Sequence, residues 1–80
     1  MRLGYMKQDI SDKHREIGKR VAKIRKEKGI SQLELSLLLG HKSVSIVASA
    51  ERHYRGAHFN LNHLFQMAEI FEIDICDFFK

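Results

Sequence analysis

Apolar residues recur along the chain at steps of three and four, the spacing that gathers side chains on one face of a helix. One segment places Ile17, Val21 and Ile24 in this way. A later segment does the same with Leu61, Leu64, Phe65, Ala68 and Phe71. No segment shows the sustained alternation of apolar and polar residues that is typical of a strand. The pattern therefore predicts an all-α chain.

The strongest boundary signal is the run Ser31-Gln32-Leu33-Glu34. It has the form of a capping box, in which the serine hydroxyl accepts from the amide of Glu34 and the glutamate accepts from the amide of Ser31. Gly29 before it and Gly40 after it suit the left-handed backbone conformation that ends a helix. We expect a short helix over residues 32–39 that stops at Gly40.

Capping residues also mark the other helices. Ser11 or Asp12 begins the first, and Ser43 begins one that continues to residue 51 or 52 with Val47 and Ala50 facing the core. Asn60 and Asp74 begin the last two. The sequence thus predicts a compact five-helix domain over residues 11–80, preceded by an N-terminal extension over residues 1–10.

The composition limits the function classes. Eighty residues fit one domain, and the single Cys76, expected to be buried, excludes an internal disulfide and four-cysteine zinc sites. No apolar run approaches the ~18 residues of a membrane span, and residues 1–10 do not resemble a signal peptide. We therefore expect a cytoplasmic protein without a membrane partner. No arrangement of nucleophile, base or paired carboxylates has a constrained spacing, so we expect no enzyme activity and no cofactor.

Basic residues outnumber acidic ones by 14 to 10, which gives a net charge of +4. They crowd the first helix and follow the third, whereas acidic residues gather near the C-terminus, at Glu69, Glu72, Asp74 and Asp77. This polarity favours a polyanionic partner on one side of the molecule.

The two short helices joined at Gly40 have the layout of a helix-turn-helix, whose first helix crosses the DNA backbone and whose second enters the major groove. Residues 17–79 resemble the phage repressor and Cro-type helix-turn-helix family, also called the xenobiotic-response-element family. The matching residues are Ile24-Arg25, Gly29-Ile30-Ser31-Gln32, Leu35-Ser36, Leu39-Gly40, Val47 through Glu51, Asn60, Leu64, Ala68, Phe71 and Asp74.

The resemblance implies a lambda-repressor-like fold, double-stranded DNA as the partner and a role in transcription regulation, most often repression. It implies a phosphate contact by Gln32 and a structural ion pair between Arg25 and Glu51. The DNA-contacting set that we expect is Gln32, Lys42, Ser43, Val44, Ser45, Ala48, Ser49, Arg52, Tyr54 and Arg55. The groove positions hold no arginine, glutamine or asparagine, so we expect modest direct readout, with a contribution from DNA shape.

We expect a homodimer on a two-fold operator whose half-sites lie ~34 Å apart. The predicted dimer surface is the apolar C-terminus, with Phe71, Ile75, Phe78 and Phe79. Leu33 and Leu37 face outward on the second helix. Either residues 1–10 fold back over them, which we favour slightly, or they bind a protein partner.

Several alternatives stay open. A phage repressor, a restriction-modification controller and an antitoxin could all share this domain, and a helical interaction module could have the same fold with weak or no DNA readout. His53, His58 and His63 are possible metal ligands, but their five-residue spacing does not place two rings on one helical face. We therefore interpret them as ordinary histidines and expect no metal site.

Overall fold

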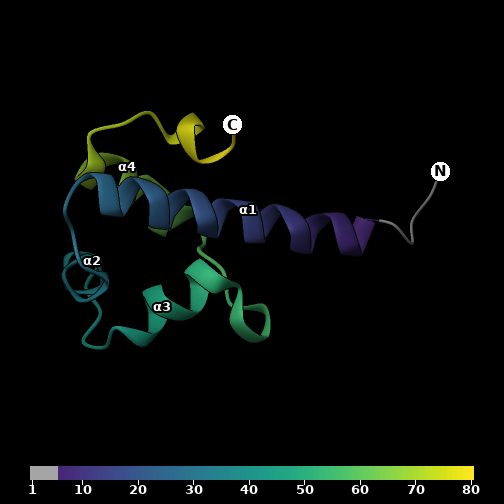
Figure 1. Cartoon of the computed structure of the whole chain (residues 1–80), viewed down its shortest axis with the longest axis horizontal. Helices are drawn as coiled ribbons and strands as arrows, with labels where there is room; N and C mark the ends of the chain where they lie inside the picture. The colour runs from purple at the N-terminus through teal and green to yellow at the C-terminus, as the bar shows by residue number, and fades with distance from the viewer. Residues whose placement is uncertain (1–5) are drawn as a thin grey trace.

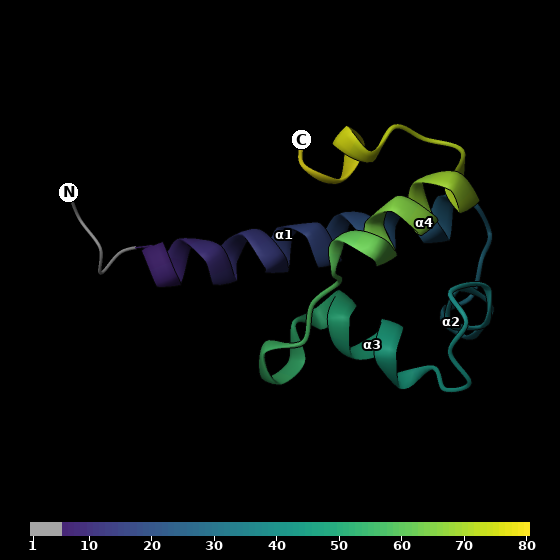
Figure 2. The same ribbon diagram turned by 180° about the vertical axis from the view of Figure 1, so that it is seen from behind.

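The computed structural model describes residues 6–80, with residues 6–9 described by their backbone alone. Within this range the chain is all-helical, as predicted, and contains no strand. It has four α-helices and two short 3-10 segments: α1 Met6–Glu27, α2 Gln32–Leu38, α3 Ser45–Arg52, η1 Tyr54–Gly56, α4 Leu61–Phe71 and η2 Ile75–Phe78 (Figure 1). Seen from either side, α2 and α3 lie together on one side of α1 and η2 lies on the other (Figures 1 and 2).

The first helix departs from the sequence prediction at its N-terminal end. It runs from Met6 through both expected caps, Ser11 and Asp12, to Glu27. Residues 6–10 contain no glycine or proline that would end a helix, so the helical conformation continues through them. The predicted start of the first helix at Ser11 or Asp12 is therefore wrong, and residues 1–5 of the expected extension lie outside the described residues.

The short helix α2 confirms the boundary prediction closely. Ser31 Oγ accepts from the amide of Glu34 at 3.0 Å, and the amide of Ser31 donates to the Glu34 carboxylate at 3.0 Å. Gly29 and Gly40 have φ values of 71° and 90°, in the left-handed region. A Cβ at Gly40 would meet no atom within 4 Å. The position therefore favours glycine because of its left-handed backbone conformation and not because a side chain would clash.

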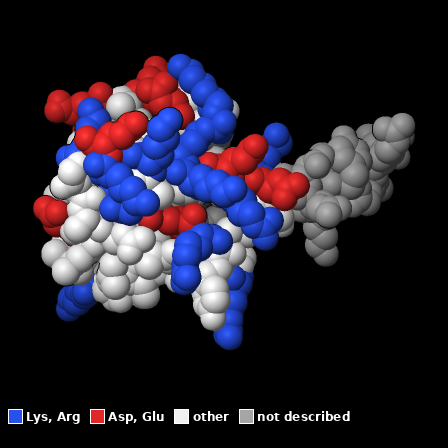
Figure 3. Space-filling view, in the orientation of Figure 1, with Lys and Arg blue, Asp and Glu red and all other residues white. Residues whose placement is uncertain are grey.

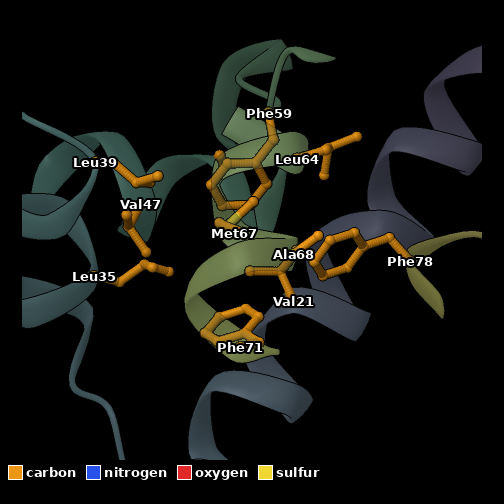
Figure 4. Close-up of a cluster of buried hydrophobic side chains, with 11 residues drawn as sticks. Val21, Leu35, Leu39, Val47, Phe59, Leu64, Met67, Ala68, Phe71 and Phe78 are labelled. Carbon is orange, nitrogen blue, oxygen red and sulfur yellow. The ribbon is translucent and has the colours of Figure 1, made fainter. Parts of the chain in front are cut away.

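A single core joins the four α-helices and η2, and it contains Val21, Leu35, Leu39, Val47, Ala50, Phe59, Leu64, Met67, Ala68, Phe71 and Phe78 (Figure 4). The predicted core positions Val47 and Ala50 of α3 are buried. On α4 the prediction is partly wrong, because Leu61 and Phe65 are exposed and Met67 is completely buried in their place. The helix is rotated slightly from the face that the sequence spacing suggested.

The backbone of α3 lies close against α1 at Gly18, a residue that the sequence pattern did not single out. A Cβ on this glycine would lie 2.7 Å from the backbone oxygens of both Ala50 and Glu51. Real Cβ atoms do not come so near to a carbonyl oxygen. The absence of a side chain at Gly18 therefore sets the distance between the two helices.

Three predictions about the C-terminal part of the chain are wrong. Asp74 does cap it, accepting from the amide of Cys76 at 2.8 Å, but Ile75–Phe78 is a 3-10 segment and not a fifth α-helix. Phe71 and Phe78 are buried in the core, so these two residues are not available for the predicted dimer surface. Of the apolar residues expected there, Phe79 is exposed and Ile75 half-buried. Cys76 is exposed rather than buried.

None of the helices in residues 6–80 combines the length and the apolar character that crossing a membrane requires.

Candidate nucleic-acid interface

The inner face of the α2–α3 pair is tightly buried. Leu35, Leu39 and Val47 meet between the two helices, and all three belong to the core. Ser36, the small residue expected where the helices cross, is completely buried. This packing fixes the angle between α2 and α3 and leaves the opposite face of α3 uncovered.

The outer face of α3 carries a stripe of small polar and apolar side chains. Ser45, Ala48, Ser49 and Arg52 are spaced at steps of three and four, so they share one side of the helix. Ser45 and Arg52 are exposed, and Ala48 and Ser49 are half-buried. Val44, just before the helix, is 39% exposed. The structure therefore leaves accessible the positions predicted to face a DNA groove.

The start of α3 differs by one residue from the prediction. Val44, not Ser43, occupies the cap position, and its side chain makes no capping hydrogen bond. Ser43 still contributes, since its Oγ accepts from the amide of Ser45 at 3.2 Å and lies 2.9 Å from Ser45 Oγ. Both hydroxyls are exposed, so this pair of serines marks one end of the outer face.

A buried ion pair holds the opposite side of α3. Arg25 Nε lies 2.7 Å from Glu51 Oε2, and a second guanidinium nitrogen donates to Oε1 at 3.2 Å. Arg25 also donates to the carbonyl oxygen of Ile30 at 2.9 Å. The ion pair therefore links α1, the loop before α2, and α3 in one hydrogen-bonded network.

Gln32 belongs to the same network. Its amide nitrogen donates to Glu51 Oε1 at 2.9 Å. A glutamine amide has two N–H donors and a carbonyl acceptor, so the side chain keeps one donor and its oxygen for another partner. The phosphate contact expected for Gln32 must use these remaining groups.

Basic side chains border the outer face. In the view of Figure 3, Lys and Arg cover much of α1, whereas the surface below it is mostly uncharged, with basic side chains at both of its lower ends. The predicted contact residues Lys42 and Arg55 are exposed and lie in the chain segments before and after α3. Apart from Arg52 at its C-terminal end, the outer face of α3 is uncharged, and it lies between two basic segments.

The segment after α3 orders two of the predicted contact residues. The guanidinium carbons of Arg52 and Arg55 lie 5.4 Å and 5.3 Å from the centre of the Tyr54 ring, within the range of cation–π interactions. Arg55 has a φ of 53°, a conformation that residues with a side chain rarely adopt. Two cationic groups are therefore held around one aromatic ring next to the end of α3.

The structure adds a row of lysines that the predicted DNA-contacting set does not include. Lys19, Lys23 and Lys26 follow helical spacing on α1 and line one groove together with Gln32 and Arg52. Their spacing in the sequence was the available signal, but only the packing of α1 against α2 and α3 brings them beside predicted phosphate-contacting residues. We call Lys19, Lys23 and Lys26 the α1 lysine row.

The histidines lie in two groups. His14 of α1 stacks on His58 with 4.0 Å between ring centres, and His53 lies within 6 Å of His14. His41 and His63 form a separate pair. Burial and the two neighbouring rings lower the pKa of His14. In the described part of the chain, no three His, Cys, Asp or Glu residues are arranged to hold a metal ion.

The outward leucines of α2 are uncovered in the described residues. Leu33 is 49% exposed and Leu37 56% exposed. Residues 6–10 continue α1 rather than folding back over these leucines, so this part of the expected cover is absent.

Comparison of the chain with protein-family models, with curated proteins and with solved structures gave no match.

Proposed function

We propose that this chain binds double-stranded DNA through a helix-turn-helix formed by α2 and α3, and that it regulates transcription. The observation that carries the proposal is the outer face of α3. It presents Ser45, Ala48 and Ser49 to solvent while the inner face is fixed in the core. A helix held in this way can enter the major groove while its contacts with the core stay intact.

Phosphate contacts would come from the basic residues around α3. Lys42 precedes the helix, and Arg52 and Arg55 are arranged around Tyr54 at its end. The α1 lysine row lines the same groove as Gln32 and Arg52. Such contacts position a protein on a duplex but carry no sequence information. In this proposal they supply most of the affinity.

Base recognition would rest on small side chains. Ser45 and Ser49 can hydrogen-bond to several bases, and Val44 and Ala48 can pack against a thymine methyl group. No side chain at these positions can make a bidentate contact to guanine or adenine. The proposal therefore includes modest base discrimination, supplemented by recognition of DNA shape.

A homodimer on a two-fold operator stays part of the proposal in a reduced form. With Phe71 and Phe78 buried in the core, the C-terminal surface could contribute Phe79 and Ile75 alone among the residues first considered. Sedimentation at micromolar concentration, with and without DNA, tests this part. A monomer under both conditions would remove the dimer from the proposal.

The main test is binding to genomic fragments over a salt series. A helix-turn-helix protein should select particular fragments, and its affinity should fall steeply as salt rises because phosphate contacts release counterions. A charge-reducing variant of the α1 lysine row, Lys23→Ala, should weaken binding to every fragment by a similar factor. Glu69→Ala on α4 is the control. Salt-independent binding, or no preference among fragments, would contradict the proposal.

A second candidate function is a protein-interaction module of the antitoxin type. The exposed pair Leu33 and Leu37 favours it, because two leucines one helical turn apart form an apolar surface that a partner helix could cover. Leu37→Glu tests it against the first proposal. Loss of a copurifying protein with DNA affinity retained would assign the leucines to protein binding.

A further inference from the structure

His41 and His63 connect two parts of the fold that are far apart in the sequence. His41 lies in the turn between α2 and α3, and His63 is in the first turn of α4. Their Nε2 atoms are 3.2 Å apart, which is hydrogen-bonding distance. Both rings are half-buried. The pair thus attaches the turn before α3 to the N-terminus of α4.

The helix cap of α4 fixes the tautomer of each ring. Asn60 Oδ1 accepts from the amide of His63 at 2.8 Å, and the amide of Asn60 donates to His63 Nδ1 at 3.3 Å. Since His63 Nδ1 accepts, the neutral ring must carry its proton on Nε2. This proton can be donated only to an unprotonated Nε2 of His41, which places the proton of His41 on Nδ1.

We propose that the His41–His63 pair is a proton-sensitive link whose two hydrogen bonds, the one between the rings and the one from the Asn60 amide, are both intact only when both rings are neutral. A proton added to His63 enters at Nδ1 and faces the amide N–H of Asn60, which ends the capping hydrogen bond. A proton added to His41 enters at Nε2 and faces the Nε2–H of His63, which ends the link. Either protonation therefore removes one of the two hydrogen bonds.

The surroundings of the pair favour the neutral state. Burial and, to a smaller extent, the neighbouring His41 lower the pKa of His63. The other titratable groups nearby are His58, which lines the same groove as His63, and Lys42, the chain neighbour of His41. Neither provides a negative charge. Among residues 10–80, whose side chains the structure describes, no carboxylate forms an ion pair with either ring that would stabilise a proton there.

A shared metal ion fits this geometry poorly. It would need the Nε2 lone pair of both rings, and His63 would then carry its proton on Nδ1, opposite the amide N–H of Asn60. Metal binding would therefore break the helix cap, and the described residues offer no third ligand. A proton is the ligand that this pair responds to.

The consequence is local to the start of α3. His41 is followed directly by Lys42, Ser43 and Val44, which lead into the helix. A proton on His41 would release this segment from α4, whereas a proton on His63 would release the Asn60 amide from the α4 cap. The inference concerns the folded chain itself and does not depend on DNA binding.

The test is the tautomer and titration of each histidine, measured by long-range nitrogen–proton NMR correlation on the full chain. At pH 8, His63 should be in the Nε2–H form and His41 in the Nδ1–H form. His53 and His58 are internal controls, since the Nδ1 of each lies 2.9 Å from a backbone carbonyl oxygen. Both should be Nδ1–H forms that protonate without losing a hydrogen bond. An Nδ1–H form of His63 would overturn the proposal.

Exchange of the Asn60 amide proton gives a second readout. After correction for the intrinsic rate, it should become about tenfold faster as the pair protonates, because one hydrogen bond is lost. In His41→Ala the pKa of His63 should rise, whereas in His58→Gln the exchange profile of Asn60 should stay unchanged. Exchange of Asn60 that does not follow the His63 titration in the wild-type chain would contradict the link.

Discussion

The two sides of α3 are built in opposite ways. The inner side carries Val47, Ala50 and the ion-paired Glu51, all buried, and it faces α1 and α2. The outer side carries Ser45, Ala48 and Ser49, which are exposed or half-buried. One helix thus has a side that determines its position and a side with few contacts inside the protein.

Under the proposed function, this difference separates stability from DNA binding along a single helix. Substitutions on the inner side should destabilise the fold, and substitutions on the outer side should leave the fold intact and change only recognition. The expected effects can be ordered by how much each substitution or pH change alters the free energy of unfolding. Each substitution in α3 also tests whether the inner side of the helix contributes more to stability than the outer side does.

The largest effect is expected for Glu51→Ala. This change leaves the Arg25 guanidinium buried without its partner and removes the acceptor of Gln32. We expect a loss of about 3–5 kcal/mol in the free energy of unfolding, the usual result when one partner of a buried ion pair is deleted. Urea unfolding measures it, with Glu69→Ala as the exposed control. A loss below about 1 kcal/mol would mean that the pair contributes little to positioning α3.

A smaller loss is expected for Gly18→Ala. Alanine favours a helix by about 1 kcal/mol over glycine, yet its Cβ would lie 2.7 Å from two backbone oxygens of α3. We expect the overlap to dominate and to destabilise the fold by about 1–3 kcal/mol. The exposed neighbour Lys19→Ala is the control. An increase in thermal stability of Gly18→Ala would show that α1 and α3 can separate without cost.

The caps of α2 and α4 should lose their contribution to stability in different pH ranges. Hydrogen bonds from Ser31 lower the pKa of Glu34, so the α2 cap is complete above the ordinary glutamate value and is lost only in acid. The pKa of His63 is also lowered, and the unfolded chain therefore takes up protons first as the pH falls. Stability from the α4 cap is complete above about pH 6.5 and decreases below it.

Between pH 8 and pH 5 we therefore expect a loss of about 0.5–1.5 kcal/mol, the contribution of one hydrogen bond. Thermal unfolding over this range measures it, and His63→Gln should reduce the slope. His14→Gln alters the other histidine group and shows how much of the change of stability with pH comes from that group. If the stability of His63→Gln changes with pH as much as that of the wild-type chain, groups other than His63 cause the pH dependence.

The smallest effect on stability is expected for Ser49→Ala on the outer side. Its free energy of unfolding should change by less than about 0.5 kcal/mol, as for most surface substitutions. If the proposed function is right, Ser49→Ala relaxes the preference among DNA sites, whereas Arg55→Ala weakens binding to all sites about equally. Competition binding with matched and altered sites distinguishes the two. Uniform weakening by both variants would refute the assignment of the groove residues.

The features that were predictable from sequence depend on neighbours along the chain. The cap of α2 needs Ser31 and Glu34 three residues apart, and the turn needs a glycine at position 40. The contact of Arg25 with Glu51 was accessible through the family resemblance. In each case, a local pattern or a known arrangement contains the necessary information.

The features that were missed depend on how distant segments meet. The need for glycine at position 18 arises from the approach of α3, and the cap role of His63 arises from a ring nitrogen that takes the place of the usual glutamate. The exposed Leu61 and Phe65 satisfy helical spacing as well as the buried Met67 does. Spacing alone cannot choose among neighbouring faces when apolar residues cover more than one of them.

The left-handed conformation of Arg55 has a consequence for how its charge is placed. A residue with a side chain forgoes about 1–2 kcal/mol by adopting this backbone conformation, which glycine adopts freely. An arginine at this position therefore carries a backbone cost that a glycine would not. Arg55→Gly should accordingly give a more stable protein that lacks one cationic contact, and a gain in stability would mark this arginine as retained for recognition rather than for folding.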